Sequence, residues 1–136
     1  MKKTSMILCG MMLLASSAMA QVKVIAHRGH WNSQGAAQNS IAAMQNAKKA
    51  DVWGSEFDVH ITTDGTVVVN HDDDIHGIII ENAKYADIKN LKLANGEPIA
   101  TLKSYLEAGK KLAPMQLILE IKAHQTPERE DRCVKA

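Results

Sequence analysis

The sequence predicts an α/β protein built on parallel strands, and three observations carry that prediction. Short apolar runs, each long enough for one strand, recur along the chain at residues 22–26, 53–61, 66–70 and 115–121. Segments with helical spacing of apolar residues lie between them, at about 40–50 and 101–111. Polar side chains gather where the apolar runs end, as they do on the functional edge of parallel α/β folds.

The first apolar run, residues 22–26, predicts a strand that ends at His27-Arg28-Gly29. Gly29 permits a tight departure into the loop that follows. The next segment is rich in alanine, with Ile41 and Met44 spaced for one helical face. Either Asn39 or Ser40 can cap this helix at its N-terminus.

The second run predicts a strand over about 53–61 that carries two acidic residues. Side chains alternate between the faces of a strand, so Glu56, Asp58 and His60 share one face. Thr63-Asp64-Gly65 is a turn signal, and residues 66–70 form a third strand, as a hairpin or a close return. His71 follows directly where this run ends.

The remainder predicts further elements of unequal clarity. Thr101 is a good N-cap for a helix that extends to about Lys111, and residues 115–121 predict a fourth strand. The intervening and final segments are predicted as a loop from Asp72 to Asp74, an apolar run at 78–80 without an assignment, a helical turn at 87–91, a loop at 95–98 and a polar stretch from Ala123 onward without an organised pattern.

The first twenty residues are predicted to be a secretory signal peptide and no part of the fold. Lys2 and Lys3 give a positive start, Met6–Leu14 is mostly apolar, and Ala18-Met19-Ala20 provides small residues for cleavage. The apolar run is short for a membrane span, so no stable membrane anchor is expected. The prediction is export, to a periplasm or outside the cell.

Composition limits what residues 21–136 can do as one domain. Without Lys2 and Lys3, 14 basic residues stand against 15 acidic ones, for a formal charge of −1. This balance argues against a nucleic-acid partner. Cys133 is the only cysteine outside the predicted signal peptide, so no intramolecular disulfide is expected.

The polar residues at the strand ends form a set suited to phosphate-ester chemistry. Ionised carboxylates on a core face require a metal, a partner charge or an open cavity. Glu56, Asp58 and Glu120 are an all-oxygen set that suits Mg²⁺ or Ca²⁺. His27 and His71 can exchange protons near neutral pH. Arg28 and Lys122, also at strand ends, add positive charge, and an arginine fork suits a phosphate.

These residues resemble the motifs of the glycerophosphodiester phosphodiesterase family. The matching motifs are His27-Arg28-Gly29, Asn39-Ser40, Glu56-Phe57-Asp58-Val59, Thr63-Asp64-Gly65, His71-Asp72, Asn95-Gly96-Glu97 and Leu119-Glu120-Ile121-Lys122. Their order and approximate spacing agree across residues 24–122.

The resemblance implies a TIM (β/α)₈ barrel and one divalent cation, Mg²⁺ or Ca²⁺, held by Glu56, Asp58 and Glu120. It implies His27 and His71 as general acid and base, without saying which is which, and it places Arg28 and Lys122 near the phosphate. The implied reaction hydrolyses small glycerophosphodiesters to glycerol 3-phosphate and an alcohol.

Two departures from the family pattern stand out. Gln38 occupies a position where the family usually has Glu, which removes one negative charge from the site's edge. A full barrel takes roughly 250 residues, so the chain is expected to hold only about the first half of one. Completion by a missing C-terminal half or by a second copy is then expected.

Other interpretations of the same residues remain open. A truncated barrel can bind a metal or a phosphorylated ligand without catalysis, and a metal-dependent hydrolase can act on another ester. His30, His60, His76 and His124 are expected to be ordinary polar positions, with His60 the one closest to the predicted site. Trp31 and Trp53 either line a substrate pocket or pack.

Overall fold

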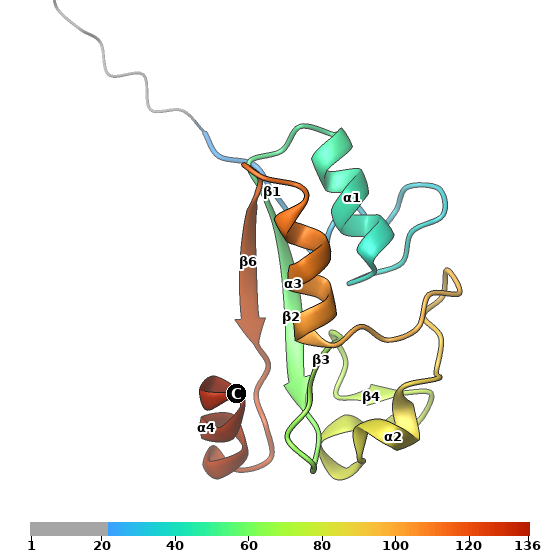
Figure 1. Cartoon of the computed structure of the whole chain (residues 1–136), viewed down its shortest axis with the longest axis vertical. Coiled ribbons are helices and arrows are strands. Elements are labelled where there is room, and N and C mark those ends of the chain that lie inside the picture. The colour runs from blue at the N-terminus through green and yellow to red at the C-terminus, as the bar shows by residue number, and fades with distance from the viewer. Residues whose placement is uncertain (1–21) are drawn as a thin grey trace, which may run out of the picture.

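Three parallel strands form the centre of the computed structural model, which describes residues 22–136 (Figure 1). β2 (Gly54–Ile61) lies in the middle, with β1 (Ile25–Ala26) and β6 (Gln116–Ile121) paired to it in parallel. Ile25 and Gln116 both pair with Gly54, so β1 and β6 lie on opposite edges of β2. The parallel sheet predicted from the sequence is confirmed; the predicted signal peptide lies outside the described residues.

β3 (Val67–Val69) does not belong to the parallel series. It pairs antiparallel with the end of β2, Val69 opposite Val59 and Val67 opposite Ile61. The hairpin interpretation of residues 66–70 is therefore confirmed. The fourth strand predicted at residues 115–121 is confirmed as β6, which is the third of the parallel strands because β3 folds back antiparallel along β2.

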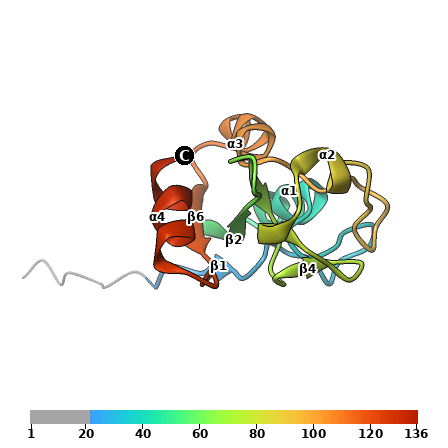
Figure 2. The same cartoon turned by 90° about the horizontal axis from the view of Figure 1, so that it is seen from below.

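Helices cover one face of the sheet (Figures 1 and 2). α1 (Ile41–Lys49) begins after Ser40, whose hydroxyl accepts a hydrogen bond from the backbone N–H of Ala43. α3 (Leu102–Lys110) begins in the same way after Thr101, which accepts from Ser104. Both helices and both caps agree with the sequence prediction.

α4 (Pro127–Lys135) occupies part of the stretch that the sequence left without a pattern. Thr126 caps its N-terminus, and Pro127 takes the first helical position, where its missing N–H costs nothing. α4 packs beside β2 and β6, with Cys133 buried. Thr126 followed by Pro127 is typical of a helix start, although the nine residues of α4 itself are mostly polar.

Between β3 and α3 the chain builds a small satellite unit. Its elements are the hairpin of β4 (Asp74–Ile75) and β5 (Ile78–Ile79), the 3₁₀ turn η1 (Ile80–Asn82) and α2 (Tyr85–Ile88). Ile80, Ile88 and Ile99 are buried together there and form a second apolar cluster. The apolar run at 78–80 thus divides between β5 and η1.

The main core lies between the sheet and the helices. Phe57 and Val59 of β2 pack against Met44 of α1 and Tyr105 of α3, with the rings of Phe57 and Tyr105 4.7 Å apart. Because side chains alternate along β2, Glu56, Asp58 and His60 point to the opposite face. Within residues 22–136, no helix is long and apolar enough to cross a membrane.

Gly29 fixes how the chain leaves β1, and it supplies a test of the fold. Its φ is +74°, and a Cβ built there would lie 2.7 Å from backbone and side-chain atoms of Ala43. Gly35 has a similar φ of +76° with nothing within 4 Å. We expect Gly29→Ala to lower the free energy of unfolding well beyond the ~1 kcal/mol expected of a left-handed alanine. Gly35→Ala, the matched control, should cost only that amount in urea unfolding, and equal losses in the two variants would contradict the close packing.

Candidate active site

Three carboxylates meet on the face of the sheet opposite α1 and α3. Glu56 and Asp58 lie two residues apart on β2, and the register places Glu120 of β6 beside Asp58. One carboxylate oxygen from each lies within 4.8 Å of the other two. The structure therefore brings together the three residues that the sequence predicted as metal ligands.

Asp58 is fully buried, and its charge is compensated from three directions. The side-chain N–H of Asn39 donates to Asp58 Oδ2 at 2.9 Å, while Asn39 Oδ1 accepts from the Asp58 backbone N–H. Lys122 Nζ lies 3.6 Å from Oδ1, and Arg28 Nε lies 3.9 Å from Oδ2. A buried carboxylate without such partners would cost several kcal/mol.

Arg28 links the carboxylates to the rest of the site. Its φ of +57° is unusual for a residue with a side chain, and in this conformation its backbone N–H donates to Glu56 Oε2 at 2.7 Å. Its guanidinium donates to Gln38 Oε1 at 2.7 Å and contacts His71 Nε2 at 2.6 Å. The predicted phosphate-binding arginine is thus held between the acidic cluster and His71.

His71 reaches the site because the β2–β3 hairpin folds back. The backbone N–H of Asn70 donates to the Asp58 carbonyl, which places the next residue beside Arg28. An arginine can only donate, so His71 Nε2 is the acceptor of that contact. The proton of the neutral ring is then on Nδ1, which donates to Asp72 Oδ1 at 2.7 Å.

His27 and Lys122 approach the cluster from its other sides. The His27 side chain is 66% exposed, with Nε2 4.0 Å from Glu56 Oε2. Lys122 Nζ donates to Glu120 Oε1 at 2.9 Å. All seven residues singled out from the sequence therefore lie around one position on the sheet.

Burial and charge shift the acidity of several of these groups. Desolvation raises the pKa of Glu56 above its ordinary value, and the neighbouring Asp58 carboxylate adds to the rise. The hydrogen bond from Lys122 lowers the pKa of Glu120, and the same bond raises the pKa of Lys122. The pKa of Glu56 is therefore raised, whereas that of Glu120 is lowered.

The acidic cluster fits a divalent cation. Glu56 Oε1 and Asp58 Oδ1 are buried and accept no hydrogen bond within the described chain, so each has a free lone pair. Hard cations bind carboxylate oxygens at about 2.0–2.6 Å, so oxygens that lie within 4.8 Å of one another can share one ion. Glu56, Asp58 and Glu120 can hold such an ion.

Some residues take parts that the sequence did not reveal. Asn39 has a φ of +61°, a conformation that Asn tolerates better than most residues, and it clamps Asp58 besides preceding the helix. Glu97 accepts from the backbone N–H groups of Ile41 and Ala42 and so anchors the start of α1. The contact between Asn39 and Asp58 is visible only in the tertiary structure. The contact between Glu97 and α1 could not be predicted because Glu97 lies far along the chain from α1.

His60 lies on the site's face of β2 but outside the carboxylate cluster. It is buried, its ring Nε2 lies 3.3 Å from the His71 carbonyl, and its ring lies edge-on to His124. Burial lowers the pKa of His60, which favours its neutral form. Its position supports the backbone of His71.

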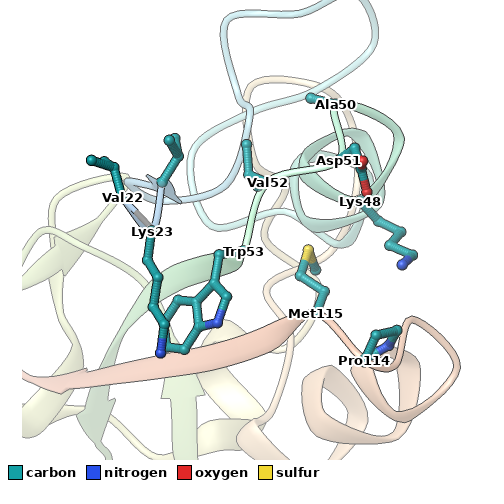
Figure 3. Close-up of a pocket in the computed structure, with 10 residues that line it drawn as sticks. Val22, Lys23, Lys48, Ala50, Asp51, Val52, Trp53, Pro114 and Met115 are labelled. Carbon is teal, nitrogen blue, oxygen red and sulfur yellow. The ribbon is translucent and has the colours of Figure 1, made fainter. Parts of the chain in front are cut away.

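A separate cavity of about 490 Å³ opens at the other end of the strands (Figure 3). Lys23 lies over the ring of Trp53 there, 4.4 Å from its centre, and Met115 and Pro114 form part of the lining. These residues precede the strands, whereas the carboxylates and histidines lie toward the strands' carboxyl ends. In parallel α/β folds, the active site lies at the carboxyl ends of the strands.

Comparison with known proteins agrees with this geometry. Residues 27–135 match the model of the glycerophosphoryl diester phosphodiesterase family. The chain belongs to this family. A glycerophosphodiester phosphodiesterase from Parabacteroides distasonis, a solved structure, is 49% identical with a TM-score of 0.81, over 83% of this chain and 48% of that one. A phosphodiesterase from Oleispira antarctica, solved with sn-glycerol-3-phosphate, is 30% identical with a TM-score of 0.68, over 80% and 48%.

Family membership also fixes the fold. The solved glycerophosphodiester phosphodiesterases have the TIM-barrel fold, so the predicted barrel type is confirmed, with this chain spanning about half the length of those structures. Among curated relatives, glycerophosphodiester phosphodiesterase from Caldanaerobacter subterraneus is 44% identical over 52 residues, which are 38% of this chain and 21% of that protein.

The raised pKa of Glu56 gives a test of the metal site. Above the ordinary carboxyl pKa, ionised Glu56 destabilises the metal-free fold, and this cost grows as the pH rises through the raised pKa. We expect Glu56→Gln to raise the thermal midpoint in EDTA at neutral pH, by on the order of a few degrees. We expect the same variant to lose the stabilisation that Mg²⁺ or Ca²⁺ gives the parent chain.

Glu120→Gln is the matched control for that measurement. The pKa of Glu120 is lowered by Lys122, so neutralising it removes a favourable contact and should not raise the midpoint. A Glu56→Gln protein that is less stable than its parent in EDTA would contradict the assignment of Glu56 as a destabilising, metal-ready carboxylate.

Proposed function

We propose that this chain forms the metal- and phosphate-binding part of a hydrolase that cleaves glycerophosphodiesters to glycerol 3-phosphate and an alcohol. The observation that carries the proposal is the convergence of three carboxylates, two cationic side chains and two histidines on one face of the sheet. An ion-pair network with a purely structural role does not need two flanking histidines. Here one of them, His71, is oriented by a hydrogen bond to the Asp72 carboxylate.

Charge compensation is the first task of such a site. A phosphodiester carries one negative charge, and charge builds up on its oxygens as the bond to the alcohol breaks. Arg28 and Lys122 bring positive charge to the point where the carboxylates meet. A divalent cation, Mg²⁺ or Ca²⁺, bound by Glu56, Asp58 and Glu120 would polarise the phosphoryl oxygens.

Proton transfer is the second task, and the hydrogen bonds of His71 suggest its direction. His71 presents an acceptor at Nε2 and is bonded through Nδ1 to Asp72, whose charge would stabilise the ring once it is protonated. We therefore assign His71 as the base that takes a proton from the attacking water, whose oxygen forms the new bond to phosphorus as the bond to the alcohol breaks. His27, whose Nε2 lies 4.0 Å from Glu56 Oε2, gives a proton to the oxygen of the departing alcohol.

The glycerol 3-phosphate half of the substrate is supported by a relative. The Oleispira antarctica phosphodiesterase, 30% identical to this chain over the matched region, was solved with sn-glycerol-3-phosphate as its product. The part of that structure matched by this chain comprises 48% of its length.

The direct test is release of glycerol 3-phosphate from glycerophosphocholine by the purified chain, with Mg²⁺, with Ca²⁺ and with chelator. We expect release that requires the metal and falls to background in Glu56→Ala, because the cluster then lacks one of its buried ligands. Leu106→Ala, which changes an exposed apolar residue of α3, is the control and should retain the parent rate.

Two other outcomes would contradict the proposal. Metal binding without turnover, in a chain folded by circular dichroism, would favour a partial barrel that binds a metal or a phosphorylated ligand. Cleavage of carboxylic esters without cleavage of phosphodiesters would favour a hydrolase of another class.

The two histidines are separated by a change of leaving group. We expect His27→Ala to lose on the order of a hundredfold or more in kcat with glycerophosphocholine, but little with a p-nitrophenyl glycerophosphodiester, whose leaving group needs no proton. His71→Ala should lose rate with both substrates. The reverse pattern would exchange the two assignments.

A further inference from the structure

One end of the molecule carries far more lysine than the chain as a whole. α1 and α3 both end where β2 and β6 begin, so the last turns of both helices lie at this end (Figure 1). We call residues 22–24, 48–53 and 110–116 the basic end. Within these described residues Asp51 is the one acidic side chain. The lysines there are Lys23, Lys48, Lys49, Lys110 and Lys111.

Helix geometry explains only part of this cluster. Lysines in the last turn of a helix are stabilised by the helix dipole, which accounts for Lys48, Lys49 and Lys110. Lys23 precedes β1 and belongs to no helix, and its Nζ lies 4.4 Å from the centre of the Trp53 ring. Within the described chain none of the five lysines forms an ion pair. Their positive charge is therefore directed at solvent.

Exposed apolar side chains lie among these lysines. Val22 is 86% exposed and Trp53 is 39% exposed. Both line the cavity of about 490 Å³ at this end, and Lys23 and Lys48 are among its other lining residues (Figure 3). Tryptophan is enriched at the boundary between lipid and water, where its ring lies at the level of the headgroups. Lysines beside it are attracted to anionic headgroups.

The opposite end of the strands has a different charge. It carries the three carboxylates of the candidate active site and Asp72. Arg28 and Lys122 balance only part of this negative charge. An anionic membrane therefore attracts the basic end and not the end that carries the carboxylates. In that orientation the candidate active site opens toward water, where a small soluble phosphodiester can reach it.

We propose that the basic end docks on an anionic phospholipid membrane, with its lysines against the headgroups and Trp53 at the boundary with the acyl chains. This association is peripheral and reversible, and it needs no membrane-spanning segment. It goes beyond the proposed function, because membrane binding does not depend on turnover. Nucleic acid is a weaker match, because the exposed Val22 and Val24 gain from contact with acyl chains but not from a phosphate backbone.

The test is cosedimentation of the purified chain with vesicles of two compositions, phosphatidylcholine alone and phosphatidylcholine mixed with phosphatidylglycerol. We expect stronger binding to the vesicles that contain phosphatidylglycerol, because the lysines are attracted to their negative surface. Binding should weaken as the salt concentration rises, because salt screens exposed charges. Binding to the anionic vesicles that is no stronger than binding to the neutral ones would overturn the proposal.

A double variant assigns the binding to the basic end. Lys110→Gln with Lys111→Gln should weaken binding to the anionic vesicles roughly 25-fold, which is about fivefold for each lysine. Lys89→Gln with Lys103→Gln is the matched control, because both side chains are exposed, lie outside the basic end and change the net charge equally. The control should bind nearly as well as the parent. Equal losses in the two double variants, both folded by circular dichroism, would overturn the proposal.

Brominated lipids show which face of the molecule enters the membrane. The sequence has two tryptophans, so Trp31→Phe leaves Trp53 as the only one and Trp53→Phe leaves Trp31. Trp31 is also 39% exposed, but it lines a cavity that His71 lines too. We expect brominated acyl chains in anionic vesicles to quench the fluorescence of Trp53 more strongly than that of Trp31. Equal quenching, or stronger quenching of Trp31, would contradict the proposed orientation and overturn the docking surface.

Two further outcomes would assign the basic end to another partner. Self-association of the parent chain without lipid, lost when Lys110 and Lys111 are replaced, would indicate a second copy of this chain. Tighter binding to duplex DNA than to the anionic vesicles, at the same salt concentration, would indicate a nucleic acid. Either result would overturn the proposal.

Discussion

The carboxylate of Asp58 has no contact with solvent, and the surrounding structure supplies it with a hydrogen-bond donor and two cationic side chains. Asn39, Arg28 and Lys122 come from three separate segments and converge on it. Placing a charge in the protein interior costs several kcal/mol unless partners compensate for it. The left-handed backbone of Asn39 and Arg28 is tolerated because it directs polar groups toward Asp58 and Glu56.

The same charge arrangement explains why the sheet has two chemically different faces. Phe57 and Val59 fill the core beneath the helices, while Glu56 and Asp58 alternate with them on the other side of β2. The core stabilises β2 through burial of apolar area. That stability holds an unfavourable group in place, since Glu56 is partly desolvated and has an oxygen without a hydrogen bond. The free energy lost by desolvating Glu56 is offset by the apolar packing on the other face of β2.

The antiparallel β2–β3 hairpin places His71 beside the parallel sheet. A βαβ connection would have carried the chain after β2 across to the other end of the sheet, whereas β3 returns at once beside β2. His71 consequently lies within hydrogen-bonding distance of Arg28. The segment after the satellite unit is anchored to the loop after β1 by Asn95 and to the start of α1 by Glu97.

Local sequence determined the strands, the two capped helices and the shared face of Glu56 and Asp58, because alternation and capping depend on near neighbours. The sequence motifs also identified the residues that gather at the site. Tertiary structure alone decided that β6 is the third parallel strand, that Asn39 clamps Asp58 and that Glu97 holds α1. Those contacts join residues 19 to 62 positions apart, and no periodic pattern records a partner at such separations. The mostly polar helix α4 escaped prediction because burial of Cys133 against the sheet, rather than an apolar stripe, places it.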